Sequence, residues 1–301
     1  MRYLLSKLIT VWVQVRDLYL FLFRRALILN SYVDDHTWRG IRHRNWGDDL
    51  NYYFVKLMTG RPVVFYHNFK IAHWLRLKNY LCIGTLLDGL NYKNAQTIVW
   101  GSGCSGAKRA LSVPKSVMSV RGRMTRDYLF EQGVDCPEVY GDPALLLPIF
   151  YKPVVQKKHK MGVIPHVIDY KHHVVEAIRV QYPDVLIIDL ANYDCWTDVI
   201  DQICSCEMIA SSSLHGLIVS DAYGIPNCWI ELGGKLSGGY FKFKDYGTSV
   251  GRQLEKPLVL DDVNKLNLLK SDITKWAPPV FNAHAILAAC PLPISKKVVA
   301  V

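Results

Sequence analysis

The stretch CEMIASSSLHGLIVSDAYG, residues 206–224, decides the fold because it joins a buried strand to a helix through a turn of three serines. Residues 206–210 are typical of a strand, and residues 214–223 of a helix that ends at a glycine. The serines 211–213 are suited to capping free N–H groups, and a helix N-terminus attracts anions. His215 in the first turn would lie beside a bound anion. Alternatively, the three serines are ordinary helix caps and His215 has only a structural role.

The same alternation of strands and helices continues on both sides of this turn. A proline-containing basic run at residues 149–160 separates two such series and is typical of an interdomain linker. The sequence therefore predicts an α/β protein of two doubly wound, Rossmann-like lobes that face a cleft, with ligands at the carboxyl ends of the strands. The expected units are a basic apolar segment 1–35, an N-terminal lobe 36–150, a C-terminal lobe 151–275 and a tail 276–301.

Composition limits the partners of the chain. Its 301 residues carry a net charge of +10, which favours anionic partners. The positive charge is scattered and no nucleic-acid motif accompanies it, so we expect small anions or a membrane surface and no nucleic acid. Eight cysteines without a C-x-x-C or zinc pattern indicate a reducing, cytoplasmic compartment and no metal site. Metalloprotease, P-loop and nucleophile-elbow motifs are absent from the sequence.

The first 30 residues are apolar and basic. Charges interrupt them before any run reaches the roughly 18–20 residues of a membrane-spanning helix, and no small-residue cleavage site follows. Two interpretations stay open. Residues 1–30 form either an amphipathic helix in peripheral contact with the inner face of a membrane, or a helix packed on the protein body.

Several short motifs lie at expected strand ends or helix starts. GSGCSG at 101–106 matches G-x-G-x-x-G, but Pro114 cuts the next helix short, so we interpret it as a glycine turn at the rim of the cleft. Arg121 at a strand end suits bidentate binding of phosphate or carboxylate. His166, also at a strand end, is equally suited to a structural role. Asp48 and Asp49 are expected mainly as helix caps. A late loop contains the polar and aromatic residues Lys242, Lys244, Asp245 and Tyr246, which either contact the acceptor sugar or belong to the plain surface.

Seven segments in this order resemble the polysaccharide pyruvyl transferase family, most closely its bacterial exopolysaccharide ketal-pyruvate transferases. The resemblance covers roughly residues 43–250 and leaves residues 1–35 outside. The segments are NWGDDLN at 45–51, WGSG at 100–103, SVRG at 119–122, YGDPA at 140–144, IPH at 164–166, SSLHG at 212–216 and AYGIP at 222–226.

The resemblance implies a two-lobed fold like that of the GT-B glycosyltransferases, with phosphoenolpyruvate as donor substrate and no cofactor. The acceptor would be a sugar of a polysaccharide or of its lipid-linked precursor, which receives a pyruvate ketal. The family's donor-binding arginine maps onto Arg121, with Arg123 as the alternative, and its histidine maps onto His215. We expect the substrate to contact Ser212, Ser213, Leu214, Gly216, Gly101, Gly103, His166, Asn45, Asp48 and Asp49.

The chemistry of these residue types agrees with that reaction. His215 would act as general acid and base with a pKa suited to neutral pH, and Arg121 would neutralise charge on the donor. Two other hypotheses compete with this one. The first is a GT-B-fold glycosyltransferase with a nucleotide-sugar donor, and the second is a non-catalytic membrane-surface protein that relies on residues 1–30.

Overall fold

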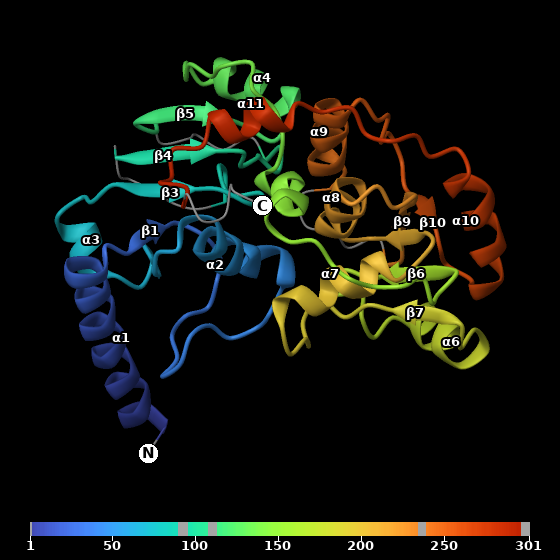
Figure 1. Ribbon diagram of the computed structural model, residues 1–301, viewed down its shortest axis with the longest axis horizontal. Helices are drawn as coiled ribbons and strands as arrows, with labels where there is room; N and C mark the ends of the chain where they lie inside the picture. Colours follow the sequence, from blue (N-terminus) through green and yellow to red (C-terminus); the bar gives the residue numbers. More distant parts are fainter. Residues whose placement is uncertain (1, 90–95, 108–112, 234–238, 296–301) are drawn as a thin grey trace.

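The computed structural model describes residues 2–89, 96–107, 113–233 and 239–295, and within them the strands form two parallel five-stranded sheets (Figure 1). The first sheet has the order β2-β1-β3-β4-β5, with β1 Leu27–Leu29, β2 Val63–Phe65, β3 Asn79–Leu81, β4 Thr97–Trp100 and β5 Ser116–Ser119. The second has the order β10-β9-β8-β6-β7, with β6 Met161–Ile164, β7 Val185–Ile187, β8 Ile209–Ser211, β9 Asn227–Glu231 and β10 Leu258–Val259. The predicted α/β class with two parallel sheets is confirmed.

Helices connect and cover these strands. Their bounds are α1 Arg2–Arg24, α2 Trp46–Thr59, α3 Lys70–Trp74, α4 Arg123–Glu131, α5 Leu147–Phe150, α6 His173–Gln181, α7 Trp196–Cys204, α8 Leu214–Ala222, α9 Phe241–Val250, α10 Leu266–Ile273 and α11 Ala283–Ala288, with 3-10 helices at Pro143–Leu146 and Val263–Lys265. The inner strands β1, β3, β4, β6 and β8 are buried along their whole length, which explains why most of their residues are apolar.

Two segments differ from the expected elements. Residues 27–29 lie inside the range 1–35, yet they form the fully buried β1, which pairs with β2 on one side and β3 on the other. This range therefore supplies a strand to the first sheet. Residues 241–250, expected as a loop, form α9, in which Asp245 and Tyr246 are fully buried rather than on the surface.

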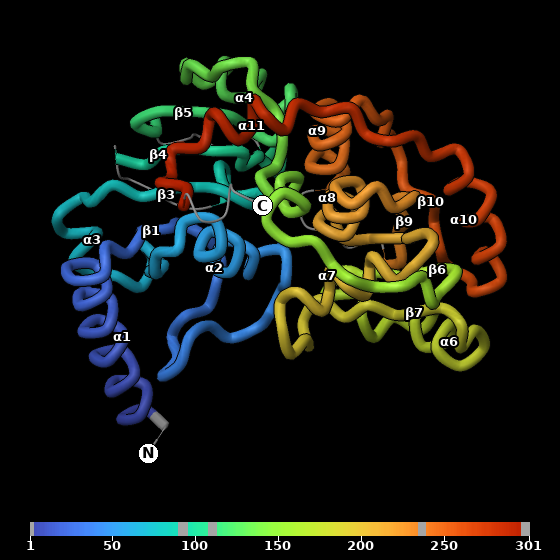
Figure 2. Tube along the Cα trace, viewed as in Figure 1, coloured from blue at the N-terminus to red at the C-terminus, as the bar shows by residue number. Residues whose placement is uncertain are grey.

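Both sheets contribute to one continuous hydrophobic core. Trp46 at the start of α2 donates its backbone N–H to Leu190 (2.7 Å) and its indole N–H to Trp196 (2.7 Å), across to the second sheet's half of the chain. After α10 the chain returns to the first sheet, as the red segment of Figure 2 shows. There the carbonyl of Ile286 in α11 accepts the indole N–H of Trp100 at 2.9 Å. Residues 296–301 of the expected tail lie outside the described residues.

Helix α1 extends from the edge of the first sheet at the lower left of Figure 1. Near its end, Phe21 packs edge-to-face on Phe69 with ring centroids 5.9 Å apart. No helix among the described residues combines the length and the apolar character needed to cross a bilayer. The contact of Phe21 with Phe69 shows that one side of α1 packs on the protein body, which is one of the two interpretations of residues 1–30.

Candidate functional site

A cavity of about 450 Å3 lies where segments from both sheets meet. Four of the segments that line it are the loops after the carboxyl ends of β3, β4, β6 and β8. The start of α2, α9 and one residue beyond β1 complete the lining. The lining residues are Tyr32, Asn45, Asp48, Thr85, Asp88, Gly89, Ser105, Ala107, His166, Ser213, Leu214, His215 and Lys242. This is the edge at which α/β sheets bind ligands, as expected from the sequence.

The serine turn forms one wall of the cavity, but it does not cap the helix in the expected way. Ser211 Oγ accepts the N–H of Ser213 (3.0 Å), and Ser212 Oγ accepts the N–H of His166 (2.8 Å). No side chain caps α8 among the described residues. The capping prediction is therefore wrong, and the first-turn N–H groups of α8 keep no partner within the described part of the chain. Gly216 is a packing residue, because a Cβ there would lie 2.2 Å from Ser211 Oγ.

His215 is buried at the floor of the cavity. Its Nε2 has no hydrogen-bond partner among the described residues, and its ring lies against Gly47, where an added Cβ would be 2.0 Å from Nδ1. Burial lowers the pKa of His215 to about 3, and the nearby Lys242, Arg121 and His166 act in the same direction. The expected pKa near neutrality is therefore corrected: without a ligand, this imidazole is neutral at pH 7.

Lys242, expected in a late loop as either an acceptor-sugar contact or plain surface, supplies the positive charge that lines the cavity. Within the described residues its ammonium forms no hydrogen bond or ion pair, and it lies 5.4 Å from the ring centroid of Phe243. Burial lowers the pKa of Lys242 to about 8; Arg121 lowers it further and Asp48 opposes the shift. Lys242 is thus a partly desolvated cation without a counter-ion in contact, which suits it to binding an anionic ligand.

Arg121, the expected donor ligand, does not line the cavity. It is fully buried and donates to three partners: Asp245 Oδ2 at 2.9 Å, Thr85 Oγ1 at 2.7 Å and the Cys104 carbonyl at 2.7 Å. Its alternative, Arg123, is exposed and its guanidinium lies 4.9 Å from the ring centroid of Tyr140. Arg121 instead ties α9 to the first sheet and thereby positions Lys242, three residues before Asp245.

The start of α2 contributes the acidic group of the cavity. Asn45 caps the helix through the N–H of Gly47 and donates its side-chain amide to Asp48 Oδ2 at 2.9 Å. Burial, with a smaller effect of Asp49, raises the pKa of Asp48 to about 6. Asp49 does not line the cavity: its carboxylate accepts the Tyr193 hydroxyl at 2.6 Å, and burial raises its pKa to about 6 as well.

The glycine motif at 101–106 contributes little to the cavity wall. Gly101 has a positive φ of 77°, and a Cβ there would lie 2.3 Å from Pro143. At Gly103 a Cβ would lie 2.3 Å from the guanidinium carbon of Arg121. Both glycines therefore permit close packing, and neither lines the cavity.

Other cavity residues were not found from the sequence. Asp88 accepts both the backbone N–H (2.8 Å) and the hydroxyl (2.7 Å) of Ser105. With Tyr32 and Thr85, these residues form the wall on the side of the first sheet. Their place in the loops that follow strand ends is the signal that would have found them. His166 lines the cavity as expected, and burial followed by Lys242 lowers its pKa to about 4.

The family model of the polysaccharide pyruvyl transferases matches residues 73–233, slightly more than half of the chain. The chain belongs to the polysaccharide pyruvyl transferase family. The match contains the serine turn and His215 but neither α2 nor Lys242. The resemblance inferred from the seven sequence segments is thereby confirmed.

Two further proteins are similar to this chain over much of its length. The chain is 31% identical over 201 residues to the uncharacterized protein L143 of Acanthamoeba polyphaga mimivirus, an alignment that covers 65% of this chain and 69% of L143. It is 29% identical over 223 residues to the succinoglycan biosynthesis protein ExoV of Rhizobium meliloti (strain 1021), over 70% of this chain and 63% of ExoV. Family membership and the similarity to ExoV together assign the chain to the transferases of polysaccharide biosynthesis.

Proposed function

We propose that the protein transfers pyruvate from phosphoenolpyruvate to a saccharide and forms a pyruvate ketal. The observation that carries this proposal is the convergence of three groups in one cavity: the N-terminus of α8, the ammonium of Lys242 and the unpartnered Nε2 of His215. Phosphoenolpyruvate carries a phosphate and a carboxylate, and these groups are suited to binding both. Family membership supports pyruvate as the transferred group.

The lowered pKa of His215 is consistent with a general acid that becomes protonated only when its substrate binds. Burial lowers this pKa most, and Lys242 and Arg121 lower it further. The negative charge of a bound donor opposes them and raises the pKa of His215, because an adjacent anion favours the imidazolium. Donor binding would therefore protonate His215 and prepare it as general acid.

The reaction then balances with two side chains of the cavity. The Nε2–H of His215 gives its proton to the methylene carbon of the donor, and the adjacent carbon becomes oxocarbenium-like. A sugar hydroxyl attacks that carbon and loses its proton to Asp48, whose raised pKa of about 6 suits it to a base near neutral pH. The bond to phosphate breaks, and the phosphate takes the proton from Asp48. A second hydroxyl closes the ketal ring and returns a proton to His215.

The other residues expected at the site have supporting roles. Ser213, Leu214 and Asn45 line the donor side, Arg121 is a positioning residue, and Ser212 holds the loop of His166. The acceptor, a polymer or lipid-linked sugar, would lie toward Tyr32, Asp88 and Ser105. Free thiols at all eight cysteines fit a reducing, cytoplasmic compartment. The two-sheet arrangement supports a GT-B-like fold.

Incubation of the protein with phosphoenolpyruvate and a panel of galactose- and glucose-containing oligosaccharides tests the proposal. Release of phosphate and new ketal methyl signals by NMR are expected. His215→Ala should abolish both, whereas His284→Ala, at an exposed histidine of α11, should leave them unchanged. Thermal stabilisation by nucleotide sugars, with none by phosphoenolpyruvate, would instead support the glycosyltransferase alternative.

A further inference from the structure

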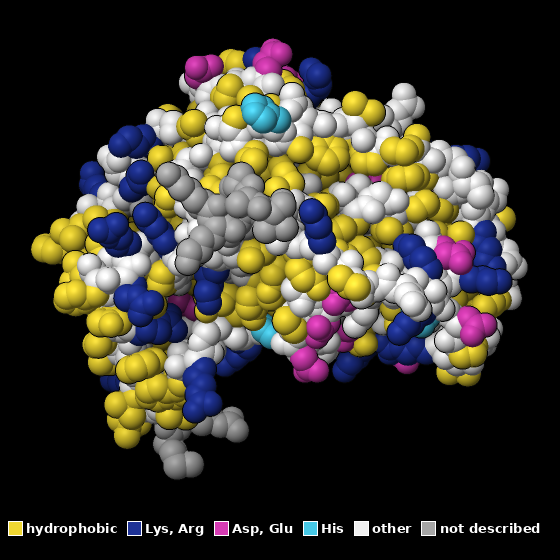
Figure 3. Space-filling view, in the orientation of Figure 1, with side chains coloured by type: hydrophobic (Ala, Val, Ile, Leu, Met, Phe, Trp, Pro, Cys, Tyr) yellow, Lys and Arg dark blue, Asp and Glu magenta, His cyan; other side chains and the backbone are white. Residues whose placement is uncertain are grey.

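Helix α1 presents its apolar side chains to the outside of the protein. A stripe of nine residues, each between 43% and 71% exposed, follows the helical spacing along its length: Leu4, Leu5, Leu8, Val11, Trp12, Val15, Tyr19, Leu22 and Phe23. In Figure 3 hydrophobic side chains cover the protruding part at the lower left, with Lys and Arg side chains beside them. A contiguous exposed apolar surface of this kind marks an interaction site.

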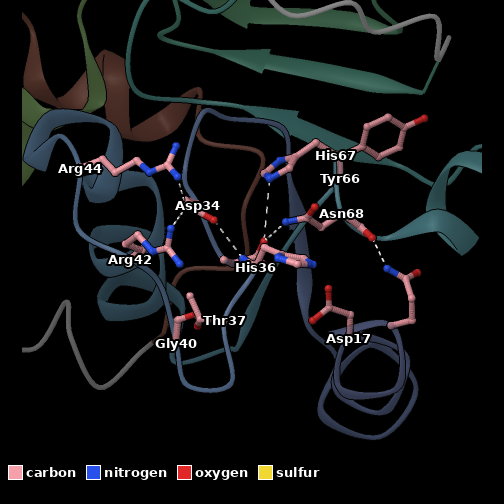
Figure 4. A network of polar contacts seen from close by, with 12 residues as sticks. Asp17, Asp34, His36, Thr37, Gly40, Arg42, Arg44, Tyr66, His67 and Asn68 are labelled. Atoms are coloured by element: carbon pink, nitrogen blue, oxygen red, sulfur yellow. Dashed lines mark hydrogen bonds and ion pairs between the residues drawn. The ribbon is translucent and has the colours of Figure 1, made fainter. Parts of the chain in front are cut away.

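Polar side chains of α1 face the protein body instead and fix the rotation of the helix. Thr10 lies within hydrogen-bond distance of His36 (2.9 Å), and Gln14 accepts the N–H of Lys70 (2.9 Å). Arg16 bonds Asp35 at 2.8 Å and Asp17 at 2.8 Å, and Asp17 is among the residues drawn in Figure 4. These anchors hold the apolar stripe outward.

The surroundings of the stripe are aromatic and basic. Trp12 donates its indole N–H to the carbonyl of Trp38 (3.2 Å), and the two rings lie 6.3 Å apart, each partly exposed. Lys7 and Arg24, near opposite ends of α1, are exposed. Asp17, the only acidic residue in the sequence of α1, is buried. The rim of the stripe thus carries positive charge that no acid of the helix balances.

We propose that α1, together with Trp38, docks on the surface of an anionic lipid bilayer, with the apolar stripe inserted and the basic residues at the headgroups. Tryptophan and tyrosine favour this interface, and basic residues add attraction to anionic lipid. The helix lies in the plane of the surface and spans about 35 Å of it. This inference does not depend on pyruvyl transfer.

The charges of the rim disfavour a second copy of the chain as occupant. Antiparallel pairing of two stripes would bring Lys7 of one copy toward Arg24 of the other, and parallel pairing would align identical cations. Because α1 exposes no acidic side chain, neither arrangement gives these cations a partner on the facing helix. An anionic bilayer satisfies all of them at once.

Co-sedimentation of the full chain with vesicles tests the proposal. We expect binding to vesicles of phosphatidylglycerol and phosphatidylcholine, weaker binding to phosphatidylcholine alone, and a decrease with added salt. Val11→Glu/Val15→Glu, at residues 61% and 58% exposed, should lower the partition coefficient by about tenfold or more for each valine. The matched control Val154→Glu/Val180→Glu makes the same charge change at exposed valines outside α1 and should bind like the parent protein.

The melting temperature and molecular mass of each variant complete the test. Both double variants should melt like the parent, because all four valines are exposed. Equal loss of binding in the two double variants would overturn the proposal, since it would assign binding to net charge alone. A parent protein that ignores vesicles but forms a dimer that Val11→Glu/Val15→Glu dissociates would also overturn it, in favour of pairing between two copies.

Discussion

The roles of Arg121 and Lys242 can be separated by two substitutions. Arg121→Gln should destabilise the protein, because it leaves Asp245 buried without its guanidinium partner. Lys242→Met should keep or raise the stability at pH 7, because the ammonium has no hydrogen bond or ion pair to lose among the described residues and because burial, which lowers its pKa to about 8, disfavours the charged form. Its loss should instead weaken the binding of phosphoenolpyruvate.

The magnitudes follow from the contacts. Removal of one partner of a buried ion pair costs about 3–5 kcal/mol. Asp245 also accepts the N–H (2.8 Å) and the hydroxyl (2.7 Å) of Thr125, so the lower value applies. A hydrogen bond to a charged group contributes about 1.5–3 kcal/mol, so Lys242→Met should weaken donor binding by about 10- to 150-fold.

Thermal unfolding with and without phosphoenolpyruvate measures both effects. The matched control is Lys244→Met on the same helix, whose ammonium pairs with the exposed Glu255 at 2.7 Å and does not line the cavity. A fully stable Arg121→Gln that has lost donor binding, beside a Lys242→Met that has kept it, would refute the reasoning and restore Arg121 as the donor ligand.

Three further predictions concern the same cavity. Calorimetric titration with phosphoenolpyruvate at pH 7 should show proton uptake, because the bound donor raises the low pKa of His215. The uptake is measured as a dependence of the binding enthalpy on the ionisation enthalpy of the buffer. This dependence should be absent in His215→Gln. Gly47→Ala should displace the His215 ring and lower turnover by at least tenfold, or about 1.4 kcal/mol of barrier, in steady-state assays. Because the pKa of Asp48 is raised from 3.8 to about 6 in the folded protein, protonated Asp48 contributes stability that is complete below pH 3.8 and lost as the pH rises through about 6. At pH 8 the buried carboxylate is charged, so Asp48→Asn should melt at a higher temperature than the parent. An unchanged melting temperature at pH 8 would contradict this prediction.

Most strands could be predicted because parallel strands buried on both faces are continuous apolar runs. TIVW at β4 and MGVI at β6 are bounded by polar or turn residues and were found. Residues 27–29 were missed because the apolar residues of α1 lead almost directly into them, and only Arg25 and Ala26 separate the two elements. Helix α9 was missed because glycines surround it and made the region resemble a loop.

The candidate site was predictable to the extent that it depends on strand ends. His166, Ser213 and His215 follow the ends of β6 and β8, and all three line the cavity. The same reasoning failed for Arg121, which also follows a strand. Its partner Asp245 is 124 residues away in the sequence, so the burial and saturation of the guanidinium depend on tertiary packing that no local pattern reports.

The glycines of the family-like segments gain a common explanation from these contacts. An added Cβ at Gly47 would collide with the ring of His215, one at Gly103 with the guanidinium of Arg121, and one at Gly122 with the backbone of Asp245 at 1.9 Å. Each glycine lets a functional or positioning side chain approach the main chain of another segment. The segments NWGDDLN, WGSG and SVRG therefore act mainly as a frame, which holds His215 and, through Arg121 and α9, Lys242 beside the same cavity.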